Sequence, residues 1–208
     1  MCKNNLTKTA CLTIVLICFT FSPVTAAVIS IDADDYPDGT DISTAFPGIT
    51  LSSVGDYTGL DGLVYAWGDA LASTSTNVFA NNLSYQRQWH AGITDGFALR
   101  ADFAYPADSV TIDIIGDDQG DIGVLYAYGA ADNLLESVTS HQLQYGEVFT
   151  AVIERASFDI KYIIAGGAAD NTVHLDNLAA NVPEPASLVL LSLGALLLRK
   201  SRNNTPPL

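Results

Sequence analysis

Between residues 27 and 182 the hydrophobic residues recur in short runs rather than at helical spacing. Val, Ile, Phe and Tyr alternate with polar residues or form brief apolar stretches, and Gly, Asp, Asn and Pro separate these runs. A period of two is typical of strands, and β-branched and aromatic residues favour them. The pattern predicts strands near 28–33, 48–54, 62–66, 77–80, 96–104, 109–115, 122–128, 134–139, 147–153, 157–164 and 173–179.

The segments between these runs indicate how the strands connect. "GDDQGD" from Gly116 is typical of a tight turn, and "AADNLL" from Ala131 predicts a hairpin. No alternation of strands with helices is visible, which argues against a parallel sheet. The sequence therefore predicts an all-β fold, an antiparallel β-sandwich of the jelly-roll type. The alanine-rich segment 68–75 is the best candidate for a short helix.

The first 26 residues have the composition of a secretory signal peptide. A weakly basic start is followed by an uncharged apolar run from Ala10 to Phe21. Val24-Thr25-Ala26 then places small residues at positions −3 and −1 before a cleavage site. The run is short for a membrane span, which takes about 20 residues. We expect cleavage after Ala26 and export of the rest. All three cysteines precede that point, so the exported domain contains no disulfide.

The end of the chain has a second distinctive order of residues. Val182, Pro183, Glu184 and Pro185 precede a stretch without charges, Ala186–Leu198, and the basic residues Arg199, Lys200 and Arg202 follow. This order resembles the PEP-CTERM sorting signal of exported bacterial proteins. The resemblance implies a membrane-embedded exosortase-type enzyme that recognises the Pro-Glu-Pro region and cleaves near it. The protein would pass through the inner membrane and reach the cell surface or the extracellular matrix of a biofilm.

Local physical chemistry agrees with that resemblance and gives the domain division. Proline disfavours helix in the residue before it, so the Pro-Glu-Pro region should stay extended and accessible. The basic end argues against a buried last strand, whereas a permanent single-span anchor remains an alternative. We expect a signal peptide (1–26), a β-sandwich (27–180), a linker with the sorting motif (181–185), a short transmembrane helix (186–198) and a basic cytoplasmic tail (199–208).

The charge of the predicted sandwich excludes one large class of partners. Residues 27–182 hold 22 acidic residues and only four cations, Arg87, Arg100, Arg155 and Lys161, which gives a formal net charge of −18. Proteins that bind nucleic acid need clustered Lys and Arg to neutralise phosphates. We therefore expect no nucleic-acid partner.

Stretches of the domain resemble carbohydrate-binding modules with a jelly-roll fold. "ISIDADDYPDGTDISTAFPGITLSS" matches their opening, and "VHLDNLAA" matches their last strand. In those modules an acidic residue of the first strand and an Asp of the last strand share a structural calcium. The resemblance thus implies a Ca²⁺ site at Asp34 and Asp176, and Asp32 and Asp35 could add oxygen ligands. The alternative is that these aspartates cap turns or face water.

Aromatic residues provide candidate platforms for sugar rings. In "SYQRQWHAG" Tyr85, Arg87 and Trp89 would alternate onto one face if the segment is a strand, and they could bind a polysaccharide. The alternative places Trp89 in the core, where we expect Trp67. Tyr126 and Tyr128 are further available platforms.

Catalytic motifs are absent from the sequence. There is no HExxH zinc motif and no G-x-S-x-G nucleophile elbow. A pair of carboxylates could serve a glycoside-active enzyme, but the many aspartates single out no pair. We expect an exported, non-catalytic protein of the surface or matrix that binds carbohydrate or acts as a matrix adhesive. A purely structural matrix protein and a glycoside hydrolase are the alternatives.

Overall fold

The chain forms a β-sandwich, as the hydrophobic pattern predicts. A computed structural model describes residues 26–83, 87–91 and 96–183. The strands are β1 (Ala26–Ile31), β2 (Ile49–Val54), β3 (Tyr65–Gly68), β4 (Asn77–Ala80), β5 (Ala98–Ala107), β6 (Ser109–Gly116), β7 (Gly123–Tyr128), β8 (Leu134–Thr139), β9 (Val148–Glu154), β10 (Ile160–Gly167) and β11 (Val173–Pro183). A 3₁₀ turn, η1 (Ala33–Asp35), follows β1.

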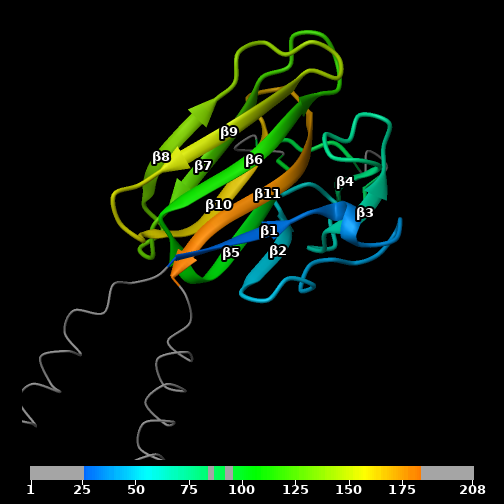
Figure 1. Cartoon of the computed structure of the whole chain (residues 1–208). Helices are drawn as coiled ribbons and strands as arrows, with labels where there is room; N and C mark the ends of the chain where they lie inside the picture. The colour runs from blue at the N-terminus through cyan, green and yellow to red at the C-terminus, as the bar shows by residue number, and fades with distance from the viewer. Residues whose placement is uncertain (1–25, 84–86, 92–95, 184–208) are drawn as a thin grey trace, which may run out of the picture. The chain divides into compact units, whose positions relative to one another are not determined.

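The strands form two antiparallel sheets (Figure 1). One sheet has the order β3-β4-β11-β6-β9, with β1 paired to β11, and the other has the order β2-β5-β10-β7-β8. Neighbours in space are mostly distant in sequence, because consecutive strands often belong to different sheets. The predicted all-β, antiparallel sandwich is therefore confirmed, and each predicted strand overlaps one of these strands.

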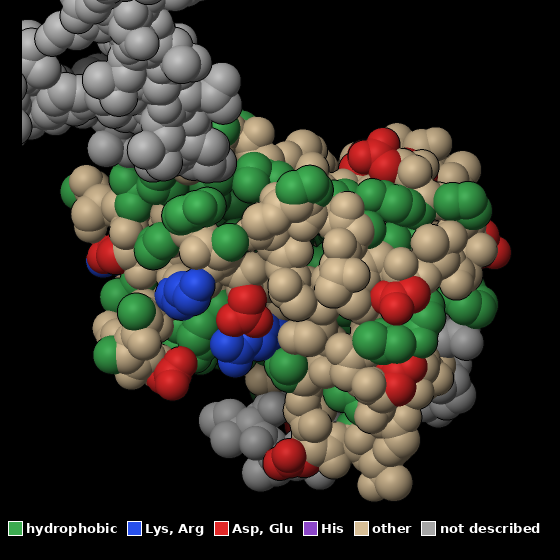
Figure 2. Space-filling model, turned by 90° about the horizontal axis from the view of Figure 1, so that it is seen from below, with side chains coloured by type: hydrophobic (Ala, Val, Ile, Leu, Met, Phe, Trp, Pro, Cys, Tyr) green, Lys and Arg blue, Asp and Glu red, His purple; other side chains and the backbone are tan. Residues whose placement is uncertain are grey.

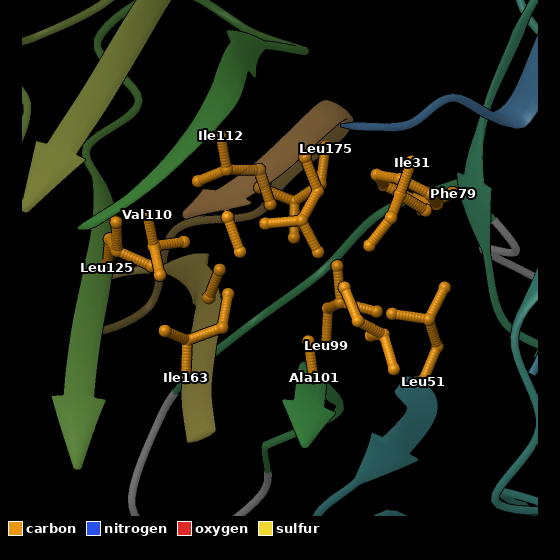
Figure 3. Close-up of a cluster of buried hydrophobic side chains, with 14 of the residues drawn as sticks. Ile31, Leu51, Phe79, Leu99, Ala101, Val110, Ile112, Leu125, Ile163 and Leu175 are labelled. Carbon is orange, nitrogen blue, oxygen red and sulfur yellow. The ribbon is translucent and has the colours of Figure 1, made fainter. Parts of the chain in front are cut away.

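Alternating side chains from the two sheets meet in one core. Figure 3 shows Ile112 and Leu175 of one sheet opposite Leu99 and Ile163 of the other, with Ile31 and Phe79 nearby. These six side chains are completely buried. The residues between them along each strand point to the outer faces, as the period of two requires. Packing of the core residues thus fixes the positions of the side chains on the outer faces of the sheets.

The segment 68–75 is not the helix that the sequence predicts. Only Gly68 belongs to a strand, and the rest is a loop of turns and bends between β3 and β4. Asp69 accepts from the backbone N–H of Leu71 within the loop, and Ser73 and Thr74 hydrogen-bond to Asp176 of β11 instead of continuing a helix. Ser, Thr and Asp compete in this way with helical backbone hydrogen bonds, which explains the failed prediction.

The last strand is longer than the sequence predicts. β11 runs to Pro183, because Asn181 still pairs with Ser109 and its side-chain amide donates to Asp108 Oδ1 at 2.7 Å. Val182 and Pro183 of the predicted sorting motif are thus the end of a strand. The rest of that motif, the predicted membrane helix and basic residues, and the signal peptide up to Thr25 lie outside the described residues. Within the part that the structure describes, no helix is long and apolar enough to cross a membrane.

Candidate functional site

Asp34 and Asp176 lie side by side around the hydroxyl of Thr74. Thr74 Oγ1 is 2.7 Å from Asp34 Oδ2, 3.1 Å from Asp176 Oδ2 and 3.3 Å from Asp32 Oδ1. Asp34 comes from η1, Asp176 from β11 and Thr74 from the loop between β3 and β4. Three segments that are remote in the sequence therefore bring these carboxylates together. We call Asp32, Asp34 and Asp176 the aspartate cluster.

Two N–H groups of the chain bind each of the two main carboxylates. Asp34 Oδ1 accepts from the backbone N–H groups of Thr76 and Asn77, both at 2.8 Å. Asp176 Oδ2 accepts from those of Ser73 and Thr74, at 2.9 and 3.2 Å. The loop is thereby held on the outer face of its sheet. The oxygens that the sequence assigns to calcium thus already fix a loop.

These contacts act in opposite directions to burial on the acidity of the cluster. Burial raises the pKa of Asp34, but the hydrogen bonds from Thr74, Thr76 and Asn77 outweigh it and leave the pKa below its usual value. Asp176 is completely buried, and this burial raises its pKa despite its hydrogen bonds. The same kind of network therefore leaves the more exposed carboxyl the stronger acid.

A β-bulge and a neighbouring carboxylate complete the surroundings of Asp176. The pairing of β11 with β6 shifts register after Asp176, where Asn177 has a φ of 48°. Asp176 pairs with Asp113 of β6, and the hydroxyl of Ser73 lies 3.0 and 2.8 Å from their carboxylates. Bulges re-aim side chains in this way.

Among the described residues no group of three or more His, Cys, Asp or Glu side chains has a geometry that would hold a metal ion. Calcium at Asp34 and Asp176 stays a prediction.

A second pair of carboxyl groups, Asp117 and Asp121, is buried in the turn between β6 and β7. Asp121 Oδ2 accepts from the backbone N–H of Asp117 at 3.0 Å, and Thr172 Oγ1 lies 3.1 Å from Asp117 Oδ2. The side chain of Gln88 also donates to Asp117. Burial and the adjacent Asp121 raise the pKa of Asp117 to about 7. The turn predicted from "GDDQGD" thus contains a buried carboxyl group that is a much weaker acid than a free aspartate.

The predicted sugar platform at Trp89 is wrong. The Trp89 side chain is completely buried, and its Nε1 donates to the carbonyl of Phe79 at 2.9 Å. Of the described residues 87–91, only Trp89 and His90 pair with other segments, in isolated bridges rather than in a strand. The backbone of Trp89 hydrogen-bonds to Gly167, the last residue of β10, and to Val173, the first residue of β11, and its ring lies in the core. Trp67, which we expected in the core, is only partly buried on β3.

Of the two other residues of that predicted platform, the structure describes only Arg87. Tyr85 lies outside the described residues. Arg87 is partly exposed, and its Nε is 3.0 Å from Asp69 Oδ2 while its Nη1 donates to the carbonyl of Gly68. Arg87 therefore fastens the start of the loop after β3. Of the residues assigned to ligand binding, Trp89 thus packs in the core and Arg87 holds a neighbouring loop.

Three tyrosines form an aromatic row on the outer face of the other sheet. Tyr128 and Tyr162 are stacked, with ring centroids 4.8 Å apart and an angle of 10° between the planes. Tyr126 lies 6.4 Å from Tyr128. Their neighbours along the strands, Leu125 and Ile163 among them, face the core. Alternation along "GVLYAY" could have indicated that Tyr126 and Tyr128 share the outer face, but not what lies beside them.

An ion pair extends this aromatic row along β5. The guanidinium of Arg100 lies 3.8 Å from the ring centroid of Tyr162, and its Nε and Nη2 each donate to Asp102 at 2.7 Å. Hydrogen bonding to Asp102 raises the pKa of Arg100, and burial raises the pKa of Tyr128 and Tyr162. The phenols therefore keep their protons and can donate hydrogen bonds at neutral pH.

A hollow opens beside the row. Its volume is about 410 Å³, and its lining consists of Val54, Gly55, Ala91, Gly96, Ala98, Tyr126, Tyr128 and Ile164. We call it the tyrosine hollow. Gly55 closes one side of it with a φ of 141°, and a Cβ there would lie 1.7 Å from the carbonyl oxygen of Gly96. Only glycine fits at that position, so the shape of the hollow depends on it.

Comparisons with known proteins give the chain no family. No family model matches it, and no curated protein matches it. Among solved structures it is similar to one described as "Carbohydrate binding module family29", with 14% identity, a TM-score of 0.41, and coverage of 76% of this chain and 90% of that one. It is also similar to the enzymatically active domain of tailspike protein 4 of bacteriophage CBA120, with 12% identity and a TM-score of 0.32. That match covers 65% of this chain and 19% of the tailspike chain.

Proposed function

We propose that this protein is an exported, non-catalytic β-sandwich that binds carbohydrate or acts as a matrix adhesive. The observation that carries the proposal is the tyrosine hollow, in which the rings of Tyr126 and Tyr128 lie beside apolar side chains on the outside of a sheet. Aromatic faces pack against the C–H faces of sugars, while phenol groups can donate to sugar hydroxyls. Pockets with mostly apolar walls and a few oriented polar groups are typical of small-ligand sites.

The ion pair beside the row supports the same class of ligand. Arg100 has five N–H donors, and Asp102 accepts from two of its nitrogens, so further donors remain for a ligand. The Asp102 oxygens can accept from hydroxyl groups. A sugar, which offers both donors and acceptors around an apolar ring, matches this combination. Nucleic acid does not, because the sandwich carries a formal net charge of −18.

A glycan array probed with the sandwich, followed by calorimetry on the best glycan, tests the proposal. Tyr126→Ala should weaken binding at least tenfold, because it removes one ring of the hollow. Tyr145→Ala is the matched control, since Tyr145 is 69% exposed and does not line the hollow. Absence of binding to every glycan would leave the purely structural matrix protein, and release of reducing ends from a bound glycan would favour the glycoside-active enzyme.

Export and sorting form the other part of the proposal. Signal peptidase would cut after Ala26, and an exosortase-type enzyme would act at the Pro-Glu-Pro region. The compact unit Ala27–Pro183 fits between these two sites and supports this assignment. Figure 1 shows the start of β1 beside the end of β11, two strands that pair with each other. Processing at both points would leave the paired strands intact.

A further inference from the structure

A second hollow opens on the same sheet as the tyrosine hollow. Its volume is about 490 Å³, and its lining includes Thr50, Asp102, Ala104 and Lys161. We call it the lysine hollow. The amine of Lys161 donates to the carbonyl of Phe103, and among the described residues it forms no ion pair. The two hollows together present aromatic rings, an ion pair and an amine.

Strand β5 connects the two hollows. Ala98 lines the tyrosine hollow, whereas Asp102 and Ala104 line the lysine hollow. All three alternate with the core residues Leu99, Ala101 and Phe103, and Arg100 lies between them on the same outer face. A rise of about 3.3 Å per residue places Ala98 and Ala104 about 20 Å apart. This distance is too long for a single sugar unit.

Cross-strand neighbours make the surface between the hollows continuous. Tyr162 of β10 pairs with Asp102 on one side and with Tyr128 on the other. Arg100 lies over the ring of Tyr162. The tyrosine row and the Arg100–Asp102 pair thus form the surface that separates the hollows. A ligand chain that leaves one hollow along β5 passes over this surface before it reaches the other.

The charges along this path favour an uncharged chain. The Arg100–Asp102 pair contributes no net charge, and each of the three arginines of the described sandwich has an acidic partner within 3.0 Å. Figure 2 shows Lys and Arg side chains next to acidic ones on one face of the molecule. Lys161 is the one cation that lines the lysine hollow. The formal net charge of −18 on the whole sandwich repels polyanions.

From these observations, and resting on the proposed function, we infer that the ligand is an internal stretch of an uncharged polysaccharide that lies along β5. Rings stack at Tyr126 and Tyr128, and hydroxyls bond to Arg100 and Asp102. The chain then enters the lysine hollow, where Lys161 donates to it. The protein would therefore hold polymer chains along their length instead of capturing their ends.

Calorimetry with a length series of the neutral oligosaccharide that binds best tests this inference. Affinity should rise at least tenfold from disaccharide to a length that spans both hollows, and then level off. Ala104→Ile fills the lysine hollow from an exposed strand position, and Lys161→Gln removes its amine. Both variants should abolish the gain for long chains and leave binding of the disaccharide unchanged. Unchanged melting temperatures establish that both variants are folded.

The outcomes separate this inference from the proposed function. If short and long oligosaccharides bind equally and Tyr126→Ala abolishes both, the carbohydrate-binding function stands and the extended site is refuted. Tighter binding of an acidic polysaccharide, such as alginate, refutes the uncharged ligand. If no glycan binds at any length, the proposed function itself fails, and the inference fails with it.

Discussion

Asp34 and Asp176, near opposite ends of the sandwich sequence, share the hydroxyl group of Thr74 at 2.7 and 3.1 Å. The contact joins the turn after β1 to β11 through the loop between β3 and β4. Backbone N–H groups of that loop add further hydrogen bonds to both carboxylates. The aspartate cluster therefore holds three segments of the fold together by hydrogen bonds, whether or not it also binds a ligand.

Removing the Asp176 carboxylate should destabilise the domain strongly. Asp176→Ala removes a completely buried carboxylate and leaves the backbone donors of Ser73 and Thr74, which are partly buried and exposed, without their acceptor. Hydrogen bonds to a charged group contribute about 1.5–3 kcal/mol each, so we expect a loss of about 3 kcal/mol in urea unfolding. Asp170→Ala, at an exposed turn position, is the control and should change little. A loss below about 1 kcal/mol for Asp176→Ala would contradict the structural role.

Calcium binding at the aspartate cluster is a separate prediction. Calcium should raise the melting temperature above its value in EDTA. At a calcium concentration of 100 times the Kd, the free energy of unfolding should increase by about 2.7 kcal/mol. Asp34→Asn keeps most of the hydrogen-bonding shape but removes a charged ligand, so it should abolish the calcium effect. Magnesium, which requires tighter octahedral geometry, is the control ion and should act less. Identical melting curves in calcium and in EDTA would refute the site.

The buried pair Asp117 and Asp121 should give stability a distinct pH dependence. The folded pKa of Asp117 is raised from 3.8 to about 7, so the folded chain binds more protons than the unfolded chain between these values. This carboxyl therefore stabilises the fold at low pH, and its contribution is lost as the pH rises from about 4 to 7. Asp117→Asn should remove that slope and stabilise the protein at pH 8 by about 2 kcal/mol. Denaturation at a series of pH values measures it.

The control for that series is the exposed neighbour in the same turn. Asp118→Asn also removes one negative charge, but Asp118 is exposed and its side chain has no part in the buried pair. It should retain the slope of the natural sequence. Equal slopes for Asp117→Asn and the natural sequence would show that Asp117 does not cause the pH dependence.

The two tryptophans should differ in their effect on stability. Trp89→Ala removes a completely buried ring and its hydrogen bond to Phe79, which should cost about 3–5 kcal/mol. Trp67→Ala removes a partly buried ring from the short strand β3 and should cost less than about 2 kcal/mol. Fluorescence provides a second measurement, because the emission of Trp89 should be blue-shifted. Equal costs for the two variants would contradict the assignment of Trp89 to the core.

Processing of the C-terminus is tested in the host. Intact-mass spectrometry of the surface protein should show loss of the segment that follows the Pro-Glu-Pro region. Glu184→Ala changes the motif beyond the end of β11, so it should block the loss without altering the sandwich. Natural protein on the surface that still ends in Leu208 would refute the sorting assignment.

Alternation in the sequence was sufficient to locate the strands. Residue types along each strand alternate between its buried and its exposed face, since side chains at odd and even positions point to opposite sides. The runs around Ile112 and Ile163 illustrate this, and both are central core residues. No such pattern in the sequence predicts the conformation of the loop 68–75, because hydrogen bonds to carboxylates of distant segments, such as Asp176, determine it.

The sequence by itself therefore determined the sandwich and its formal net charge of −18, from which we expect no nucleic-acid partner. Tertiary structure alone decided that Trp89 is buried and that a hollow lies beside Tyr126. Trp89 stands between the polar residues Gln88 and His90, yet its ring is buried in the core, whereas Tyr126, between Leu125 and Ala127, faces outward beside a hollow. The difference depends on which segments of the chain approach each ring. Local alternation contains no information about such approaches, because they depend on pairing between strands that are far apart in the sequence.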